Sequence, residues 1–443
     1  MPTDRRIDRS DVLVAAGLTL ALLAIYNSNG REIGSFDSQP NKFAARELLL
    51  RGTVTLNHVV GGTPEYLNRH AFILSRDGNF RSAYSPVPSI LAAGVCWPLW
   101  KAGLIDIRAP RGANWIAVIG ASLLTALAVS LAFLTARFWL PRGSALVLSA
   151  ALGLGTGYWY LASQTLWEHE TALFGMAIAT FAFAAPDPRF SIQRAVWTGI
   201  GLSLAGLGRP QLAPMILIVT VGVHVRGGLR AFAVTAAIVA ASGLSLMWVF
   251  VKWFGSPLGM MAVLEEVSRG DHLNTGPFTL PFVGAAGLLV SPNRGLFVFS
   301  PAVLVVLPGI RDAVGAGWRS PFRWCGLAAL SQYLVYASFS VWWGGHTYGP
   351  RYMLDLLPVV VPLAAAGLLR LKPHRILAVA AVAAAIWSIV VAGTGAFCYP
   401  HDEWNTDPVS VNRDHRRLWS WRDQQVVRCW QRGPSPQNFD LFR

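Results

Sequence analysis

Residues 114–136 read NWIAVIGASLLTALAVSLAFLTA, a run without a charged side chain, and this run decides the fold. A helix needs about 20 mainly apolar residues to cross a bilayer. Comparable runs recur along the chain, at residues 11–26, 144–162, 170–185, 195–208, 211–225, 231–254, 296–310, 324–341, 352–369 and 376–393. The pattern predicts an all-α polytopic membrane protein with about eleven transmembrane helices.

The composition agrees with this class of protein. Of the 443 residues, 53% are hydrophobic and 14% are charged, whereas about a quarter are charged in a soluble domain. The formal net charge of +14 comes from 37 Lys+Arg against 23 Asp+Glu. In a membrane protein such an excess belongs to the cytoplasmic loops, so nucleic acid is not an expected partner.

The orientation depends on residues 85–104, an apolar stretch that contains Pro86, Pro88 and Pro98. If this stretch does not cross, several Arg-containing loops share the side of the N-terminus, at residues 137–143, 186–194, 226–230, 311–323 and 370–375. Basic residues mark cytoplasmic loops. We therefore expect a cytoplasmic N-terminus, with the proline-bearing stretch in the outer interface.

This orientation defines the expected domains. Residues 1–395 form a transmembrane domain with two long outer loops, 27–113 and 255–295, which hold interfacial helices. Residues 396–443 form an extracytoplasmic tail. Because the outer side is oxidising, we predict a Cys398–Cys429 disulfide in this tail.

Ionisable side chains gather at the expected outer ends of the spans, whereas transporters usually place such groups at mid-membrane. This distribution favours a site at the outer membrane surface over a pore. The residues concerned are Asp37, Glu168, His169, Glu170, Arg209, Arg294, His346 and Arg351.

Two of the outer segments contain candidate catalytic carboxylates. Asp37 stands in GSFDSQP (34–40), ahead of an expected surface helix at 41–51, and it is either a proton acceptor for a hydroxyl or a turn residue before a helix. The segment SQTLWEHE (163–170) offers Glu168 or His169 for function. The alternative for its two glutamates is solvated charge at a helix end.

The segment WWGGHTYGPRY (342–352) is the densest loop of the chain. Its aromatic residues and glycines suggest a flat surface for sugars or lipid headgroups, to which His346 and Tyr348 contribute. The planar fork of Arg351 suits a phosphate. The alternative for Arg351 is a local ion pair with Asp355, four residues later.

Arg209 and Arg294 are further candidate phosphate ligands. Arg209 precedes a proline between two spans, so its alternative role is to cap the end of a helix. Arg294 stands at an expected helix start, where backbone donors converge.

These features resemble the GT-C superfamily of membrane glycosyltransferases, in particular its protein-mannosyltransferase and aminoarabinose-transferase-like branch. Members have an acidic residue soon after the first span, which is the place of Asp37, and a second one in the next outer loop, matched by Glu168. Between them lie a surface helix and a proline-rich stretch, which Tyr84-Ser85-Pro86-Val87-Pro88 resembles. The first acidic residue of the family is often paired, whereas Ser38 follows Asp37 here.

The resemblance implies transfer of a sugar from a polyprenyl-phosphate donor to a hydroxyl of a glycan, lipid or protein acceptor outside a bacterial plasma membrane. Asp37 would be the base, with Glu168 orienting the acceptor, and Arg351 would bind phosphate, with Arg209 and Arg294 as further ligands. A divalent cation at the two carboxylates is left open. The alternative is a transporter or flippase of lipid-linked sugars, against which the charge-free span interiors argue.

Overall fold

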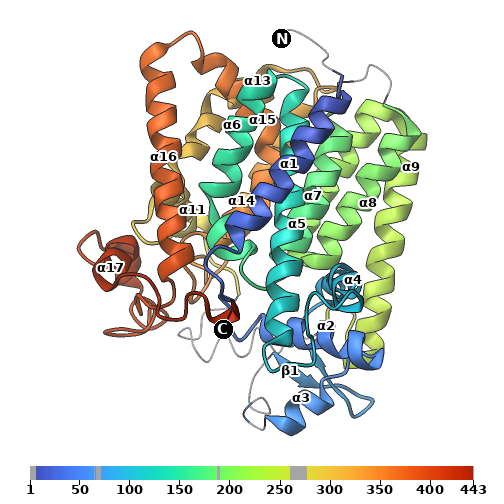
Figure 1. The fold of residues 1–443 in the computed structure, drawn as a ribbon. Helices are drawn as coiled ribbons and strands as arrows, with labels where there is room; N and C mark the ends of the chain where they lie inside the picture. Colours follow the sequence, from blue (N-terminus) through green and yellow to red (C-terminus); the bar gives the residue numbers. More distant parts are fainter. Residues whose placement is uncertain (1–5, 64, 66–70, 187–189, 260–276, 443) are drawn as a thin grey trace.

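The computed structural model describes residues 6–63, 65, 71–186, 190–259 and 277–442, and it is almost entirely helical (Figure 1). Within these residues, five helical stretches are long and apolar enough to cross a membrane. They are α1 (Arg9–Tyr26), α5 (Gly112–Arg137), η3 with α9 (Pro210–Phe254), η5 with α15 (Arg351–Leu371) and α16 (Arg375–Cys398). The chain is therefore an all-α polytopic membrane protein, as the sequence predicts.

Shorter helices complete the bundle between these stretches. They are α6 (Arg142–Leu154), α7 (His169–Ala184), α8 (Ile192–Gly208), α13 (Val306–Gly315) and α14 (Pro321–Ala337). The element α9 (Ala213–Phe254) is interrupted at Gly228, whose φ of 76° is outside the helical range. Glycine adopts this conformation without a Cβ clash, so the chain turns back there and makes the two helices expected at 211–225 and 231–254.

Three expected spans are not continuous helices. The run 144–162 breaks after α6 and resumes as the π-helix η2 (Tyr158–Ala162), and 296–310 divides into α12 (Leu296–Phe299), η4 (Pro301–Val305) and the start of α13. The run 352–369 begins as the 3₁₀-helix η5 (Arg351–Leu356) before α15 (Leu357–Leu371). Glycines interrupt the first run. In the other two runs a proline begins or precedes the new element. Proline has no backbone N–H, so it cannot continue the helical hydrogen bonds.

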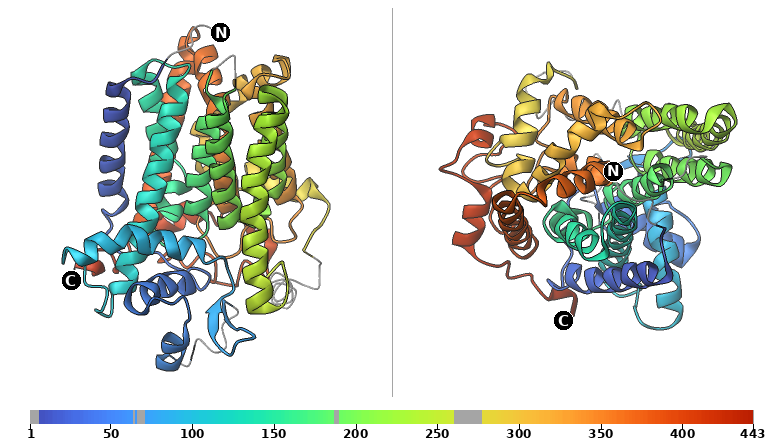
Figure 2. Two further views of the ribbon diagram at one scale, coloured as in Figure 1. Left: turned by 90° about the vertical axis from the view of Figure 1, so that its right-hand side faces the viewer. Right: turned by 90° about the horizontal axis from the view of Figure 1, so that it is seen from above.

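A layer of short elements covers one end of the bundle (Figure 1). It contains α2 (Gln39–Arg51), α3 (Asn57–Gly62), the antiparallel hairpin of β1 (Phe72–Leu74) and β2 (Phe80–Ser82), and α4 (Val87–Lys101). Figure 2 (left) shows α4 lying across the bundle axis. This agrees with the expectation that 85–104 does not cross, while the cytoplasmic position of the N-terminus stays a prediction.

The remaining elements belong to the second long loop and the tail. Helix α11 (Pro281–Val290) lies in the loop expected at 255–295, of which residues 260–276 are outside the described residues. The expected boundary at residue 395 falls inside α16, so the tail starts at Tyr399. It contains η6 (His415–Trp419), α17 (Gln425–Arg432) and η7 (Asp440–Phe442), and a disulfide joins Cys398 to Cys429 as expected.

Helices α7 and α8 approach each other through glycine. A Cβ on Gly201 of α8 would lie 2.4 Å from the backbone nitrogen of Ala179, and a Cβ on Gly175 of α7 would lie 2.5 Å from that of Ala205. The two backbones are therefore in direct contact. This contact sets where Arg209, at the end of α8, meets the start of α7.

We predict that Gly201→Ala lowers the thermal unfolding midpoint of the purified protein, because the added methyl group forces the two backbones apart. Overpacking of this kind costs about 1–3 kcal/mol. Gly17→Ala is the matched control, since a Cβ there meets nothing within 4 Å. Equal midpoints for the two variants would contradict the close packing of α7 on α8.

Candidate active site

A buried polar network joins α7, α8, α14 and η5. Asp355 of η5 accepts a hydrogen bond from the Tyr336 hydroxyl of α14. Its Oδ1 lies 2.9 Å from Nδ1 of His169, and its Oδ2 lies 3.0 Å from Nε of Arg209. Arg209 and His169 also contact each other, with 3.0 Å between Nη1 and Nε2. All four side chains are buried.

This network determines the protonation of the imidazole. A guanidinium group only donates hydrogen bonds, so Nε2 of His169 accepts from Arg209. Nδ1 then carries the proton and donates it to the carboxylate of Asp355. His169 is thus a neutral bridge, and Asp355 is the charge partner of Arg209.

A second, more open pair lies beside this network. Nη1 of Arg351 is 3.9 Å from Oδ2 of Asp37, and their side chains are 17% and 33% exposed. The Arg351 guanidinium lies 5.4 Å from the centre of the Trp167 ring and 5.3 Å from that of Tyr352. Arg209 lies 5.9 Å from the same Tyr352 ring, so one tyrosine contacts both guanidinium groups. Asp355, the alternative partner of Arg351 in the sequence, is paired with Arg209.

Glu168 lies directly before α7 and is partly exposed. Burial raises the pKa of its carboxyl group to about 7, and the carboxylates of Asp37 and Asp355 also raise it, against the opposing charges of Arg209 and Arg351. A carboxyl group that titrates near neutral pH exchanges a proton readily in both directions. Asp37 and Glu168 therefore act on one electrostatic site, together with the two arginines.

Tyr84 completes this site from the segment that follows β2. Tyr84 lies beside Asp37, and burial together with the charges of Asp37 and Glu168 raises the pKa of the phenol well above its ordinary value. The phenol therefore stays protonated beside the carboxylate. In the sequence, Tyr84 belongs to the proline-rich stretch and has no predicted role of its own.

Asp355 is another site residue without a functional role predicted from the sequence. A signal was present, because it is the one acidic residue in the apolar run 352–369. An ionisable group inside such a run indicates a functional site by default. The aromatic partners Tyr336 and Tyr352 carry no comparable signal in the sequence.

Two predicted binding residues have structural roles instead. Arg294 is fully buried, and its guanidinium donates to five protein oxygens. Tyr348 is also fully buried, and its hydroxyl donates to the backbone oxygen of Val391 at 3.0 Å. Neither presents a donor to a ligand, because each donor already has a protein acceptor.

Two other expectations about the outer loops are corrected. Trp342 and Trp343 are buried against the tail rather than forming a flat exposed surface, since Trp343 donates to Asn412 and lies beside His415. His346 of the same loop is exposed. Glu170 is fully buried, so it is not solvated charge at a helix end.

A divalent cation at Asp37 and Glu168 stays a prediction. Within the described residues, no third His, Cys, Asp or Glu ligand atom groups with these two carboxylates. A cation there would take its further ligands from water or substrate, which hard cations such as Mg²⁺ readily accept.

An apolar cavity of about 570 Å³ adjoins the site. Met353 and Leu356 of η5 line it, so the short helix that carries Arg351 and Asp355 also forms a wall of the cavity. The lining continues along α14 and α15 to Trp318 and Arg323. Pockets for small molecules commonly have volumes of roughly 300–1,000 Å³.

Comparison with known proteins gives little further information. No family model and no curated protein matches the sequence. Among solved structures, the chain is similar to an oligosaccharyltransferase of Archaeoglobus fulgidus that was crystallised tethered to an acceptor peptide with an NVT sequon, at 11% identity and a TM-score of 0.45. The match covers 92% of this chain and 59% of that one, so this chain spans less than two thirds of that protein. A likeness at this level carries no functional conclusion.

The raised pKa of Glu168 predicts a titration that infrared spectroscopy can follow. The protonated-carboxyl signal removed by Glu168→Gln should disappear with a midpoint near pH 7, whereas Glu403→Gln, at an exposed residue, should leave this signal in place. The folded state keeps this proton up to a higher pH than the unfolded state does. The contribution of Glu168 to the free energy of unfolding of the wild type should therefore fall as the pH rises from about 4.5 through about 7. A midpoint at the ordinary value of 4.5 would show that the carboxyl group is solvated.

Proposed function

We propose that the chain is a membrane glycosyltransferase that moves a sugar from a polyprenyl-phosphate donor to an acceptor hydroxyl. One observation carries the proposal. Two guanidinium groups, those of Arg209 and Arg351, contact one tyrosine ring and share an electrostatic site with the carboxylates of Asp37 and Glu168. Such a transfer needs a base for the acceptor and positive charge for the departing phosphate.

The arginines suit a phosphate in different ways. Nε of Arg351 is buried and makes no hydrogen bond to a described residue, and its Nη1 is 3.9 Å from Asp37, which is long for a hydrogen bond. The guanidinium fork therefore keeps donors for an anion. Arg209 is held in place by Asp355 and His169, so its charge is oriented before a ligand arrives.

The two carboxylates suit the acceptor side of the reaction. We assign Asp37 as the base and Glu168 as the group that orients the acceptor hydroxyl. Arg351 is an ion-pair partner of Asp37 at 3.9 Å, so a phosphate that binds Arg351 would compete with Asp37 for the guanidinium group. The carboxylate of Asp37, beside Tyr84, would then be available to the acceptor hydroxyl.

The apolar cavity supports a lipid-linked donor. A polyprenyl chain is a long hydrocarbon, and the cavity wall formed by η5 leads directly from the arginines into an apolar lining. A lipid phosphate also needs no nucleotide-binding domain, and the sequence has no glycine-rich phosphate loop of that kind. The sugar would then sit at the outer end of the bundle, where the sequence resemblance to GT-C enzymes also puts it.

A flippase of lipid-linked sugars is the alternative, and the reach of the cavity to Arg323 favours it, because Arg323 offers a second cation to a phosphate headgroup. The lining between the two ends is almost wholly apolar, however. A sugar would lose its hydrogen bonds to water there without replacement, at a cost of several kcal/mol. The transferase is therefore the better account.

We predict that Asp37→Asn lowers the turnover number at least 10²-fold, the contribution typical of general base catalysis, and leaves donor binding intact. The assay uses purified protein and a radiolabelled polyprenyl-phosphate sugar. Asp77→Asn, a partly exposed carboxylate in the same outer segment, should turn over normally. Wild-type turnover of Asp37→Asn would remove the proposed base, and movement of the lipid without transfer would favour the flippase.

We further predict that Arg351→Lys raises the KM for the donor roughly tenfold, because a lysine cannot reproduce the two parallel bonds of a guanidinium fork to phosphate. Arg416→Lys is the control, since the side chain of Arg416 is 94% exposed. An unchanged KM would mean that the donor phosphate binds elsewhere.

A further inference from the structure

The C-terminal tail contacts the segment that leads to Asp37. The backbone N–H groups of Phe439 and Leu441 donate to the carbonyl oxygens of Asn29 and Gly30, each at 2.8 Å. In return, Nη2 of the buried Arg31 donates to the carbonyl oxygen of Tyr399 at 2.7 Å. Residues 29–31 are thus bonded to both ends of the tail, and Asp37 follows six residues later.

The tail also contacts the loop that leads to Arg351. The side chains of Asn405 and Gln425 both donate to the carbonyl oxygen of Thr347, at 3.1 and 3.2 Å. The oxygens of the same two amides accept from Arg294, at 2.6 and 2.9 Å. Arg294 therefore binds the same two tail side chains that contact the loop. Thr347 is four residues before Arg351.

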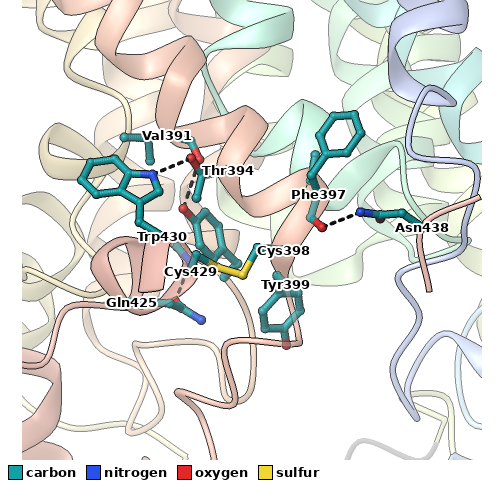
Figure 3. The surroundings of a disulfide bond; sticks show 12 residues. Val391, Thr394, Phe397, Cys398, Tyr399, Gln425, Cys429, Trp430 and Asn438 are labelled. Carbon is teal, nitrogen blue, oxygen red and sulfur yellow. Dashed lines mark hydrogen bonds between the residues drawn. A yellow bond between two sulfur atoms is a disulfide. The ribbon is translucent and has the colours of Figure 1, made fainter. Parts of the chain in front are cut away.

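The disulfide closes the part of the tail that carries these amides. Cys398 ends α16 and Cys429 lies in α17, with 31 residues of separation that include Asn405 and Gln425. Figure 3 shows two further bonds at this junction, from Nε1 of Trp430 to Oγ1 of Thr394 and from Nδ2 of Asn438 to the oxygen of Phe397, both 3.0 Å long. The tail is therefore attached to α16 through Cys429, Trp430 and Asn438.

We propose that residues 399–442 act as a clamp that holds the Asp37 segment against the Arg351 loop, and that the Cys398–Cys429 disulfide keeps this clamp closed. The tail supplies no group to the chemistry proposed above. It positions two groups, one at each side, that lie on segments more than 300 residues apart in the sequence. The tail lies at the edge of the bundle, beside α16 (Figure 1).

The test compares Cys398→Ala/Cys429→Ala with Cys96→Ala/Cys325→Ala, which removes the two buried free cysteines instead. Hydrogen–deuterium exchange is measured by mass spectrometry on the full chain in lipid nanodiscs. The clamp predicts faster exchange in residues 29–38 and 343–352 of the first variant only, with α5 and α7 unchanged. Faster exchange confined to residues 399–442 would overturn the clamp.

A second variant keeps the proposal testable if loss of the disulfide prevents folding. Arg31→Gln leaves both cysteines in place and removes the bonds from the Arg31 guanidinium to the tail. This variant should exchange faster in both site segments. That includes residues 343–352, although the guanidinium group of Arg31 donates to Ala396 and Tyr399. Loosening of residues 29–38 alone would show two independent contacts and no clamp.

The kinetic readout rests on the proposed function, and the exchange readout does not. In both variants transfer should fall by about tenfold or more, since a displacement of roughly 1 Å at a reacting group can cost 10²-fold in rate. Faster exchange in a protein that transfers no sugar would keep the clamp and reject the transferase. Normal transfer by a variant whose site segments exchange faster would reject the clamp as a positioning device.

Discussion

The ion pair between Asp355 and Arg209 is the interaction on which the site depends. It joins the end of α8 to η5, and His169 and Tyr336 add the start of α7 and the helix α14 to the same carboxylate. Removing one partner of such a buried pair costs about 3–5 kcal/mol, because the other charge is left without compensation. The carboxylate of Asp355 thereby holds four elements in fixed positions at the end of the bundle that the layer of short elements covers.

The site contains two kinds of charged group, one buried and one partly exposed. The inner charges of Asp355 and Arg209 compensate each other and are closed to solvent, whereas the outer charges of Asp37, Glu168 and Arg351 are partly exposed. The inner pair thus serves to orient, and the outer groups have donors and acceptors left for a ligand. The short helix η5 connects this site to the apolar cavity, so a headgroup and a hydrocarbon chain can be bound next to each other.

Hydropathy was enough to predict the helical class, because long apolar runs have few other solutions in a membrane. Hydropathy did not reveal the breaks near Gly155 and Pro301. Glycine and proline carry no charge, so an apolar run stays hydrophobic even where they end the helix. The alternative of a local pair between Arg351 and Asp355 also assumed one regular helix. Residues four apart share a face of an α-helix, but residues 351–356 form a 3₁₀-helix with three residues per turn, so Arg351 and Asp355 point in different directions. The role of Arg294 depended on Asn405 and Gln425 of the tail, and that of Tyr348 on Val391 of α16. These partners are far along the chain, and no local pattern discloses them.

The most direct measurement is the position of a donor phosphate in a structure of the protein in lipid nanodiscs with a polyprenyl phosphate. The account predicts the phosphate within hydrogen-bonding distance of Arg351, beside Arg209, with the first isoprene units against Met353 in the apolar cavity. A phosphate bound at the other end of that cavity, next to Arg323, or a lipid that leaves the cavity empty, would contradict it.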